Sequence, residues 1–379
     1  MEDFEQYDLE DYMEENSDVN MYNSSVIWGM DWTAETIVSQ MEKGNIDINP
    51  KFQRRDAWTQ NEKSRLIESL MLNLPVPPII LAEMKDKKNK FIVIDGKQRL
   101  LSIKQFCSKK EEFEKLQLKN MEILTELNGK TMLELEQDSS YEKYVTFFEN
   151  ATLRTIVIKN WPNEQFLYSV FLRLNTGSKS LSPQELRQAL HPGKFLDFLD
   201  DATAESKELM KVLRNNKADS RMRDVELALR YFGYKYNRKG NNGNLRVFLD
   251  NTCKILNDSW EKKEIEIKEQ FGELERAIAF CFKVFGEKAA FSKFYKEEFS
   301  NRFNRALFEV FTFYFSDKYI RENLEVDNFI KLFKVLSIED IEFVDSISNT
   351  TKDVRKVEKR FSEIEKILSE CLPMLPVHY

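Results

Sequence analysis

FIVIDGKQRLLSIKQF, residues 91–106, joins a run of strand formers to a helical pattern through one short turn. The run ends at Asp95-Gly96, and two cations, Lys97 and Arg99, follow at once. Because the segment KNKFIVID is strongly apolar, we expect it to form a strand in the centre of a sheet. After the turn, Leu and Ile recur on adjoining helical turns, which predicts a helix from about Lys97. The stretch therefore indicates an α/β domain.

The same turn is a candidate site for an anionic ligand. Backbone N–H groups at a helix start lack partners within the helix, and together with the helix dipole they attract anions. Gly96 allows a ligand to approach the backbone, while Lys97 and Arg99 suit phosphate. Asp95 could hold a metal ion or orient a water or hydroxyl. The alternative is a capped turn with both cations on a solvated face, because a lone Asp-Gly is common.

Composition limits the class of protein. The 379 residues include 29 Phe but only 11 Gly and 9 Pro, which favours a mostly helical protein with aromatic cores. The four cysteines are scattered without a CxxC pair, so neither a disulfide framework nor a zinc site is expected. No apolar run approaches a membrane span, and the start lacks the basic residues of a signal peptide. A cytoplasmic protein is the expectation.

Charge is unevenly distributed along the chain. The net charge is −7, yet residues 1–42 contain no Lys or Arg, and residues 43–99 carry twelve basic against seven acidic residues. The composition of residues 1–30 predicts a flexible acidic tail. A sharper alternative is that this tail mimics DNA and covers a basic groove, or docks on a partner.

Further elements are predicted on both sides of the turn. Helices are expected over 33–44, from a capping box at Thr59 and Glu62 through residue 74, and over 163–174. Strands are expected within 74–84 and 151–160, and 46–58 should be extended.

A domain boundary is expected near residues 190–205. Before it, LSPQELRQAL carries Ser182 as N-cap, Pro183 at the first helical position and Glu185 in a capping box. HPG at 191–193 then breaks the chain, and almost only helical patterns follow. The predicted fold class is α+β, with a small α/β domain over 31–195 and an all-helical domain over 196–379.

Two other polar stretches are candidate ligand sites. In NPKFQRRDAW, Gln53 and Arg54 lie on an expected extended segment. Adjacent residues of a strand point to opposite faces, so Arg54 and Arg55 cannot both face one ligand. One would reach a phosphate and the other a carboxylate such as Asp56, or both would be surface arginines. Asn175, in the loop LNTGS, would either close over a ligand or cap the neighbouring helices.

A basic patch in the helical half is a candidate DNA interface. The stretch 221–248 interleaves cations with Tyr and Phe, a composition that tracks a phosphate backbone and stacks on bases. The alternative is an amphipathic helix with a basic outer face. The cations proposed to contact DNA are Arg221, Arg223, Arg230, Lys235, Arg238 and Lys239.

Four motifs, in order, carry a family resemblance. FQRRDAW, LIESLMLNLPVPPI, VIDGKQRL and FLRLNTGSKSLSPQELR resemble the DUF262 family, which includes the N-terminal domain of GmrSD-type modification-dependent restriction enzymes. The resemblance covers residues 33–190, and RMRDVELALRYF continues it. It implies a fold similar to ParB and sulfiredoxin, a nucleoside triphosphate bound or hydrolysed at the "DGQQR" motif, and a role in defence against phage DNA.

The match extends to individual residues, with two departures. Asp95, Gly96, Gln98 and Arg99 match "DGQQR", and Gln53 with Arg54 matches its "FQR" partner. Lys97 replaces the commoner Gln, which adds positive charge. Many relatives also carry a C-terminal HNH nuclease, whose chemistry requires a histidine. The two histidines, His191 and His378, lie in no such pattern, so no HNH nuclease is expected.

These observations lead to a nucleotide-binding module of a phage-defence system and a candidate Mg²⁺-dependent NTPase. The expected catalytic residues are Asp95, Gln98 and Arg99, the nucleotide contacts Gln53, Arg54, Gly96, Lys97 and Asn175, and the Mg²⁺ ligand Asp95. Candidate partners are DNA, a separate effector or nuclease protein, and further copies of the chain. The alternative is a non-catalytic DNA-binding or partner-binding protein with a ParB-like fold.

Overall fold

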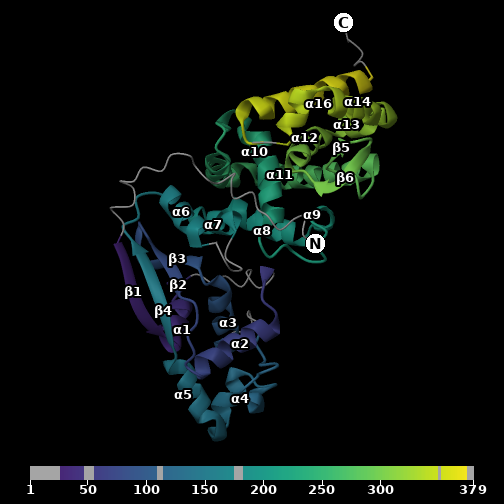
Figure 1. The fold of residues 1–379 in the computed structure, drawn as a ribbon. Coiled ribbons are helices and arrows are strands. Elements are labelled where there is room, and N and C mark those ends of the chain that lie inside the picture. Colours follow the sequence, from purple (N-terminus) through teal and green to yellow (C-terminus); the bar gives the residue numbers. More distant parts are fainter. Residues whose placement is uncertain (1–25, 47–54, 109–113, 175–181, 349–350, 374–379) are drawn as a thin grey trace. The chain divides into compact units, whose positions relative to one another are not determined.

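The computed structural model describes residues 26–46, 55–108, 114–174, 182–348 and 351–373. These residues divide into two units, with the boundary between Leu190 and His191 (Figure 1). Each unit has its own elements and core, and each is described by itself below. None of the described helices is long and apolar enough to cross a membrane.

The first unit contains a four-stranded mixed sheet. Its strands are β1 (Val26–Thr33), β2 (Ile79–Met84), β3 (Lys87–Asp95) and β4 (Thr152–Lys159). They are arranged in the order β1-β4-β2-β3. β2 and β4 pair in parallel, whereas β1 with β4 and β2 with β3 pair antiparallel. The strands predicted within 74–84, 88–95 and 151–160 are therefore confirmed.

The prediction that the KNKFIVID strand is central is wrong, because β3 lies at an edge of this sheet. Its apolar character has another cause. Phe91 belongs to the hydrophobic cluster on one face of the sheet, and Ile92 and Ile94 belong to the cluster on the other. The edge is also partly paired, since the Phe91 N–H donates to the Asn45 carbonyl at 2.8 Å. A strand buried on both faces is apolar whatever its position in the sheet.

The acidic tail predicted for residues 1–30 needs a correction at its end. Residues 26–30 belong to β1, which pairs with β4 over all eight of its residues. This ladder of backbone hydrogen bonds fixes the segment although several of its side chains are exposed. Residues 1–25 lie outside the described residues, so the remaining part of that expectation stays a prediction.

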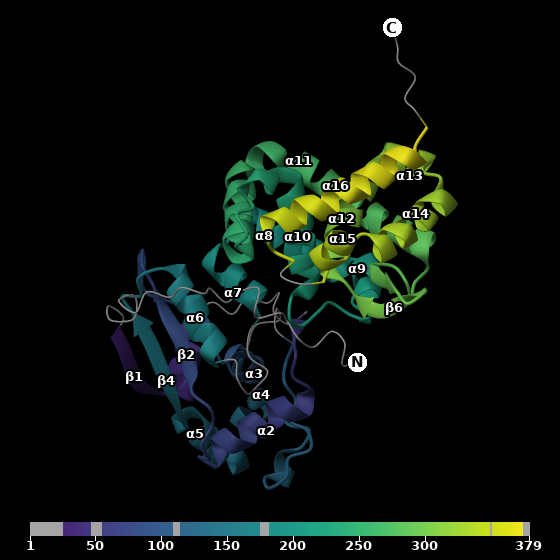
Figure 2. The same ribbon diagram turned by 45° about the horizontal axis from the view of Figure 1, so that its top comes forward.

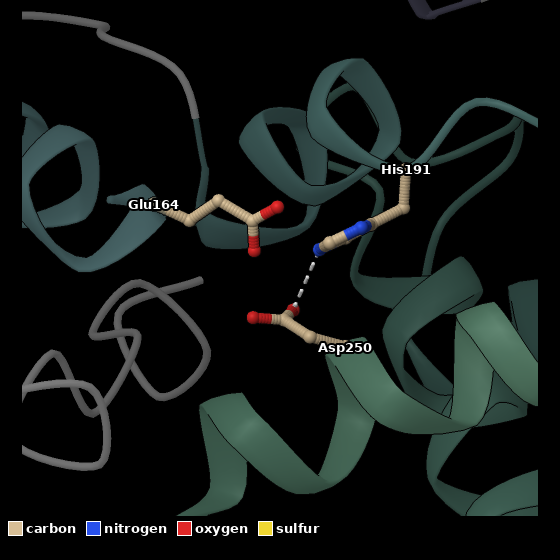
Figure 3. A group of neighbouring side chains, drawn as sticks. All are labelled: Glu164, His191 and Asp250. Atoms are coloured by element: carbon tan, nitrogen blue, oxygen red, sulfur yellow. Dashed lines mark ion pairs between the residues drawn. The ribbon is translucent and has the colours of Figure 1, made fainter. Parts of the chain in front are cut away.

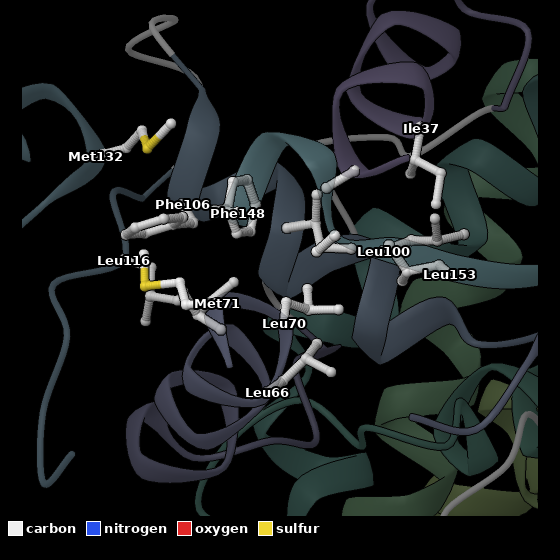
Figure 4. Packing of buried hydrophobic residues seen from close by; sticks show 14 of the residues in the cluster. Ile37, Leu66, Leu70, Met71, Leu100, Phe106, Leu116, Met132, Phe148 and Leu153 are labelled. Carbon is white, nitrogen blue, oxygen red and sulfur yellow. The ribbon is translucent and has the colours of Figure 1, made fainter. Parts of the chain in front are cut away.

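Helices cover both faces of the sheet. The helices of this unit are α1 (Ala34–Glu42), α2 (Gln60–Met71), α3 (Lys97–Cys107), α4 (Met132–Gln137), α5 (Glu142–Asn150), α6 (Glu164–Leu174) and α7 (Pro183–Leu190). Side chains from α1 to α5 fill the larger cluster, in which Phe106 and Phe148 meet edge to face (Figure 4). Side chains from α6 and α7 fill the smaller one. The predicted capping box at Thr59 and Glu62 is confirmed.

The second unit is helical, as predicted. Its helices are α8 (Lys194–Glu205), α9 (Lys207–Val212), α10 (Arg223–Asn237), α11 (Leu245–Phe285), α12 (Arg305–Phe315), α13 (Lys318–Asn323), α14 (Val326–Glu339), α15 (Ile341–Ser346) and α16 (Val354–Cys371), several of them labelled in Figure 2. Aromatic side chains pack in its core, where Phe285, Phe311 and Phe333 contact one another. The α+β fold class is confirmed.

One hairpin interrupts this helical unit. β5 (Ser292–Tyr295) and β6 (Glu298–Phe303) pair antiparallel around Lys296 and Glu297. Both turn residues have positive φ, 49° and 65°. Such a turn normally carries Asn-Gly or Asp-Gly, and the sequence has Lys-Glu instead. The prediction of an all-helical domain missed the hairpin because that turn signal is absent.

A buried ionic network ties three helices of the second unit together. Arg230 of α10 donates to Glu226 and to Glu309 of α12, each at 2.8 Å. Arg360 of α16 donates to the other oxygen of Glu309 at 2.5 Å. All four side chains are at most 4% exposed. Removing one partner of such a network leaves an uncompensated charge in a medium that solvates it poorly.

Candidate functional site

The turn between β3 and α3, which is the candidate anion site, has a backbone geometry that Gly96 determines. Gly96 adopts φ 100°, a left-handed conformation that disfavours any side chain. A Cβ atom there would lie 3.2 Å from Ile79 and 3.3 Å from the Arg99 guanidinium. α3 begins at Lys97, and no side chain caps its N-terminus. The N–H groups of this first helical turn are therefore not occupied by a capping side chain.

Arg99 is fixed inside the protein beside this turn. Its Nη2 donates to the Asp95 carboxylate at 2.9 Å and to the Pro78 carbonyl at 3.0 Å. Arg99 is 7% exposed, whereas the Asp95 side chain keeps 21% of its exposure. The alternative of two cations on a solvated face is therefore wrong for Arg99, and Lys97 is equally buried at 6%. Burying two cations at one turn requires compensating partners.

Lys97 has such a partner 88 residues along the chain. Its Nζ lies 2.7 Å from Oε1 of Glu185, the third residue of α7, and both side chains are at most 7% exposed. The other Glu185 oxygen accepts the Ser182 N–H at 2.7 Å, and Ser182 Oγ accepts the Glu185 N–H at 3.1 Å. The predicted capping box is confirmed. Glu185 also ties the start of α7 to the start of α3.

Several buried polar atoms near these two helix starts lack a hydrogen-bond partner among the described residues. They are Oε1 of Gln98, Nε of Arg99 and Nε2 of Gln184. Gln98 is 8% exposed and Gln184 fully buried. Each unsatisfied buried group costs about 1–3 kcal/mol, so native proteins rarely retain one without a reason. A polar ligand would satisfy these groups.

A second polar cluster extends along α3. Lys63 of α2 forms an ion pair with Asp56 and donates to Gln105 of α3 at 2.8 Å. The carboxylate of Asp56 thus pairs with Lys63, and Arg55, at 1% exposure, is not a surface arginine. Every side chain from Lys97 to Phe106 is buried, and six of the ten are polar or charged. α3 is therefore a buried helix that carries many polar side chains.

Three predicted contact residues lie outside the described residues: Gln53, Arg54 and Asn175. The structure brings the other predicted site residues, 95–99, together at one turn, as contiguous sequence must. It adds Glu185, which the sequence indicated only as a helix cap. The capping box was a usable signal for this second role. A glutamate in a capping box needs only one carboxylate oxygen for the cap, so the other oxygen can pair with a cation.

Most of the cations proposed to contact DNA make contacts with other residues of the second unit. Arg230 is 3% exposed in the ionic network, so its prediction as a DNA contact is wrong. Its guanidinium lies on the buried face of α10, where it pairs with the Glu309 carboxylate of α12. Two of the other cations form ion pairs: Arg223 with Asp219 at 2.6 Å and Arg238 with Glu358 at 2.8 Å. The Lys235 ammonium lies 4.6 Å from the centre of the Phe313 ring. Arg221 is half-buried, and Lys239 is exposed. Burial lowers the pKa of Lys235.

His191 is placed as a buried side chain. Its Nε2 lies 3.7 Å from the Asp250 carboxylate, and both side chains are at most 5% exposed (Figure 3). Two residues on, a Cβ at Gly193 would come within 2.5 Å of the Asn257 side chain, which accepts the Phe195 N–H at 3.1 Å. A larger residue at this position would therefore have to displace the Asn257 side chain. His191 thus belongs to the packing of the chain break at 191–193.

Comparison with known families identifies the first unit. A family model described as the N-terminal domain of the GmrSD restriction endonuclease matches residues 34–192. Residues 34–192 are therefore similar to that domain. The predicted resemblance over 33–190 is confirmed, and the GmrSD N-terminal domain coincides with the unit that carries the β3–α3 turn. Neither curated proteins nor solved structures gave a match, so the likeness to ParB and sulfiredoxin stays a prediction.

Proposed function

We propose that the GmrSD N-terminal domain of this chain binds a nucleoside triphosphate at the β3–α3 turn and hydrolyses it as part of a restriction system. The observation that supports this most is the uncapped start of α3 beside a buried Arg99 and the unsatisfied Oε1 of Gln98. A helix start with a buried arginine provides both N–H groups and fixed positive charge for phosphate oxygens.

Each residue of the turn has a defined part in this proposal. Gly96 lets the phosphates approach the backbone, and the first N–H groups of α3 bind them. Arg99 stabilises the charge that develops during phosphoryl transfer, since Asp95 and the Pro78 carbonyl already hold its guanidinium in place. Gln98 orients the attacking water or contacts the nucleotide. Fixed donors are effective because they need little reorganisation during the reaction.

Asp95 suits a divalent cation. Mg²⁺ prefers carboxylate oxygens and keeps several waters, and the Asp95 side chain is the more exposed of the two carboxylates tied to this turn, at 21% against 5% for Glu185. When bound, the ion would neutralise phosphate charge. Lys97 would contact a phosphate by exchanging its Glu185 partner for the ligand.

Coupling to DNA or to a separate effector belongs to the same proposal. The family takes its name from a restriction endonuclease, and DNA is the ligand of such a system. The cations proposed to contact DNA offer little support for the alternative of a non-catalytic DNA-binding protein. Arg230 is buried, and Arg223 and Arg238 are held by carboxylates.

Phosphate release tests the proposal. ATP, GTP and CTP would each be assayed with Mg²⁺, with and without DNA, for the natural chain, Arg99→Lys and Asp95→Asn. Lysine keeps the charge of Arg99 but cannot reproduce its two fixed contacts. We expect kcat/KM to fall by about 100-fold or more in both variants, the usual effect of losing a group that stabilises the transition state.

Asp31→Asn and Arg154→Lys are matched controls. They alter an Asp–Arg pair with a similar 3.1 Å contact, but one that is exposed on β1 and β4. Turnover should be unchanged in both, and thermal unfolding should show that all four variants fold. Equal activity in Arg99→Lys and the natural chain would remove the β3–α3 turn from the chemistry.

A further inference from the structure

A groove in the second unit lies between α14, α15 and α16, which pack against one another. Its volume is about 580 Å³. Its lining combines apolar side chains with carboxylates. The apolar lining residues are Leu332, Val335, Leu336, Ile341 and Ile367, and the charged ones are Glu339, Asp340, Glu342, Glu370 and Lys359.

Two of the apolar side chains that line this groove are exposed. Ile341, the first residue of α15, is 82% exposed, and Val335 of α14 is 41% exposed. Ile338, one helical turn after Val335, is 61% exposed. Val335 and Ile341 thus expose apolar surface at the groove, and Ile338 adds a third exposed apolar side chain within the same seven residues of sequence. Patches of this kind, rimmed by polar residues, mark interaction sites.

The charge of the lining side chains determines what kind of partner fits. Four carboxylates face one cation, Lys359. Its ammonium is bound to Asp340 at 3.0 Å, and to Glu342 and Glu363 at 3.2 Å each, which raises its pKa. Glu339 and Glu370 form no ion pair with another described residue. The groove is therefore net negative, so it repels phosphate groups and favours a cationic partner.

We propose that this groove binds a basic amphipathic helix of a partner protein. Apolar side chains at spacings of three and four residues would contact the apolar lining residues, and Lys or Arg beside them would meet Glu339 and Glu370. α14 has 14 residues, so the partner would need about three to four turns to lie along it. This groove belongs to the second unit, whereas the proposed nucleotide site belongs to the first.

A peptide provides the probe. We would label a fourteen-residue Leu/Lys peptide with Leu at helical spacing and measure its fluorescence anisotropy with the full chain. Binding of one peptide per chain is expected, weakened about tenfold or more by Ile341→Asp and by Glu339→Lys with Glu370→Lys. Ile265→Asp, at a 76% exposed position of α11, is the matched control and should retain the natural affinity. These exposed substitutions should leave thermal unfolding unchanged.

Other outcomes would overturn the proposal. Equal affinity in Ile341→Asp and Ile265→Asp would mean that the peptide binds by net charge alone. Equal binding of a Leu/Glu peptide would show that the groove does not select a cationic partner. A dimer that Ile341→Asp dissociates would make a second copy the occupant. If the peptide binds only after deletion of residues 374–379, the occupant is the end of this chain.

Discussion

Glu309→Ala should lower the free energy of unfolding of the second unit by about 3–5 kcal/mol, the usual cost of breaking a buried ion pair. Glu309 binds Arg230 through one oxygen and Arg360 through the other. Its loss leaves Arg360, at 1% exposure, without its carboxylate. Urea unfolding followed by circular dichroism would measure the change.

Two variants separate the charge from other effects. Glu309→Gln keeps the size and one acceptor, so its cost should lie between those of Ala and the natural residue. Glu358→Ala removes the partner of Arg238 from an exposed pair and should cost less than about 1 kcal/mol. A Glu309→Ala variant as stable as Glu358→Ala would show that the network does not hold α10, α12 and α16 together.

The second large effect is expected at Lys97 and Glu185. Lys97→Gln removes the cation that pairs with the buried Glu185 carboxylate, and Glu185→Gln removes that carboxylate from the buried Lys97 ammonium. Each should cost the first unit about 3–5 kcal/mol. The double variant removes both charges, so it should cost clearly less than the sum, with a coupling energy of about 2 kcal/mol or more. Urea unfolding of the natural chain, the two single variants and the double variant would measure this coupling energy as a double-mutant cycle.

Ser182→Ala distinguishes the ion pair from the helix cap. It removes the acceptor for the Glu185 N–H but leaves the Lys97 contact in place. Loss of a cap costs about 1 kcal/mol, well below the effect of an unpaired buried charge. Additive effects of Lys97→Gln and Glu185→Gln would show that the two side chains do not depend on each other.

Local signals predicted the parts of the fold that local interactions determine. The capping boxes at Thr59 and Ser182 are read within four residues, and both are present. The β3–α3 turn was likewise predictable, because Gly96 must adopt the positive φ that ends β3 before α3.

Features that depend on distant residues were not predictable. The edge position of β3 depends on β4, which follows it by more than fifty residues. Arg230 was predicted to be a surface cation because its buried partner, Glu309, lies 79 residues away in the sequence. The same holds for Lys97 and Glu185 across 88 residues. Residues 26–30 of strand β1 were assigned to an acidic tail because the pairing of β1 with β4 leaves no local pattern.

The central claim is that the β3–α3 turn binds a nucleoside triphosphate. Calorimetric titration of the natural chain with slowly hydrolysed analogues of ATP, GTP and CTP, in the presence of Mg²⁺, tests it most directly. We predict that at least one binds once per chain, with a Kd of about 100 μM or lower, and that Arg99→Lys weakens it while Arg154→Lys does not. Absence of binding by all three would contradict the claim and leave the buried Arg99 and Lys97 with a structural role.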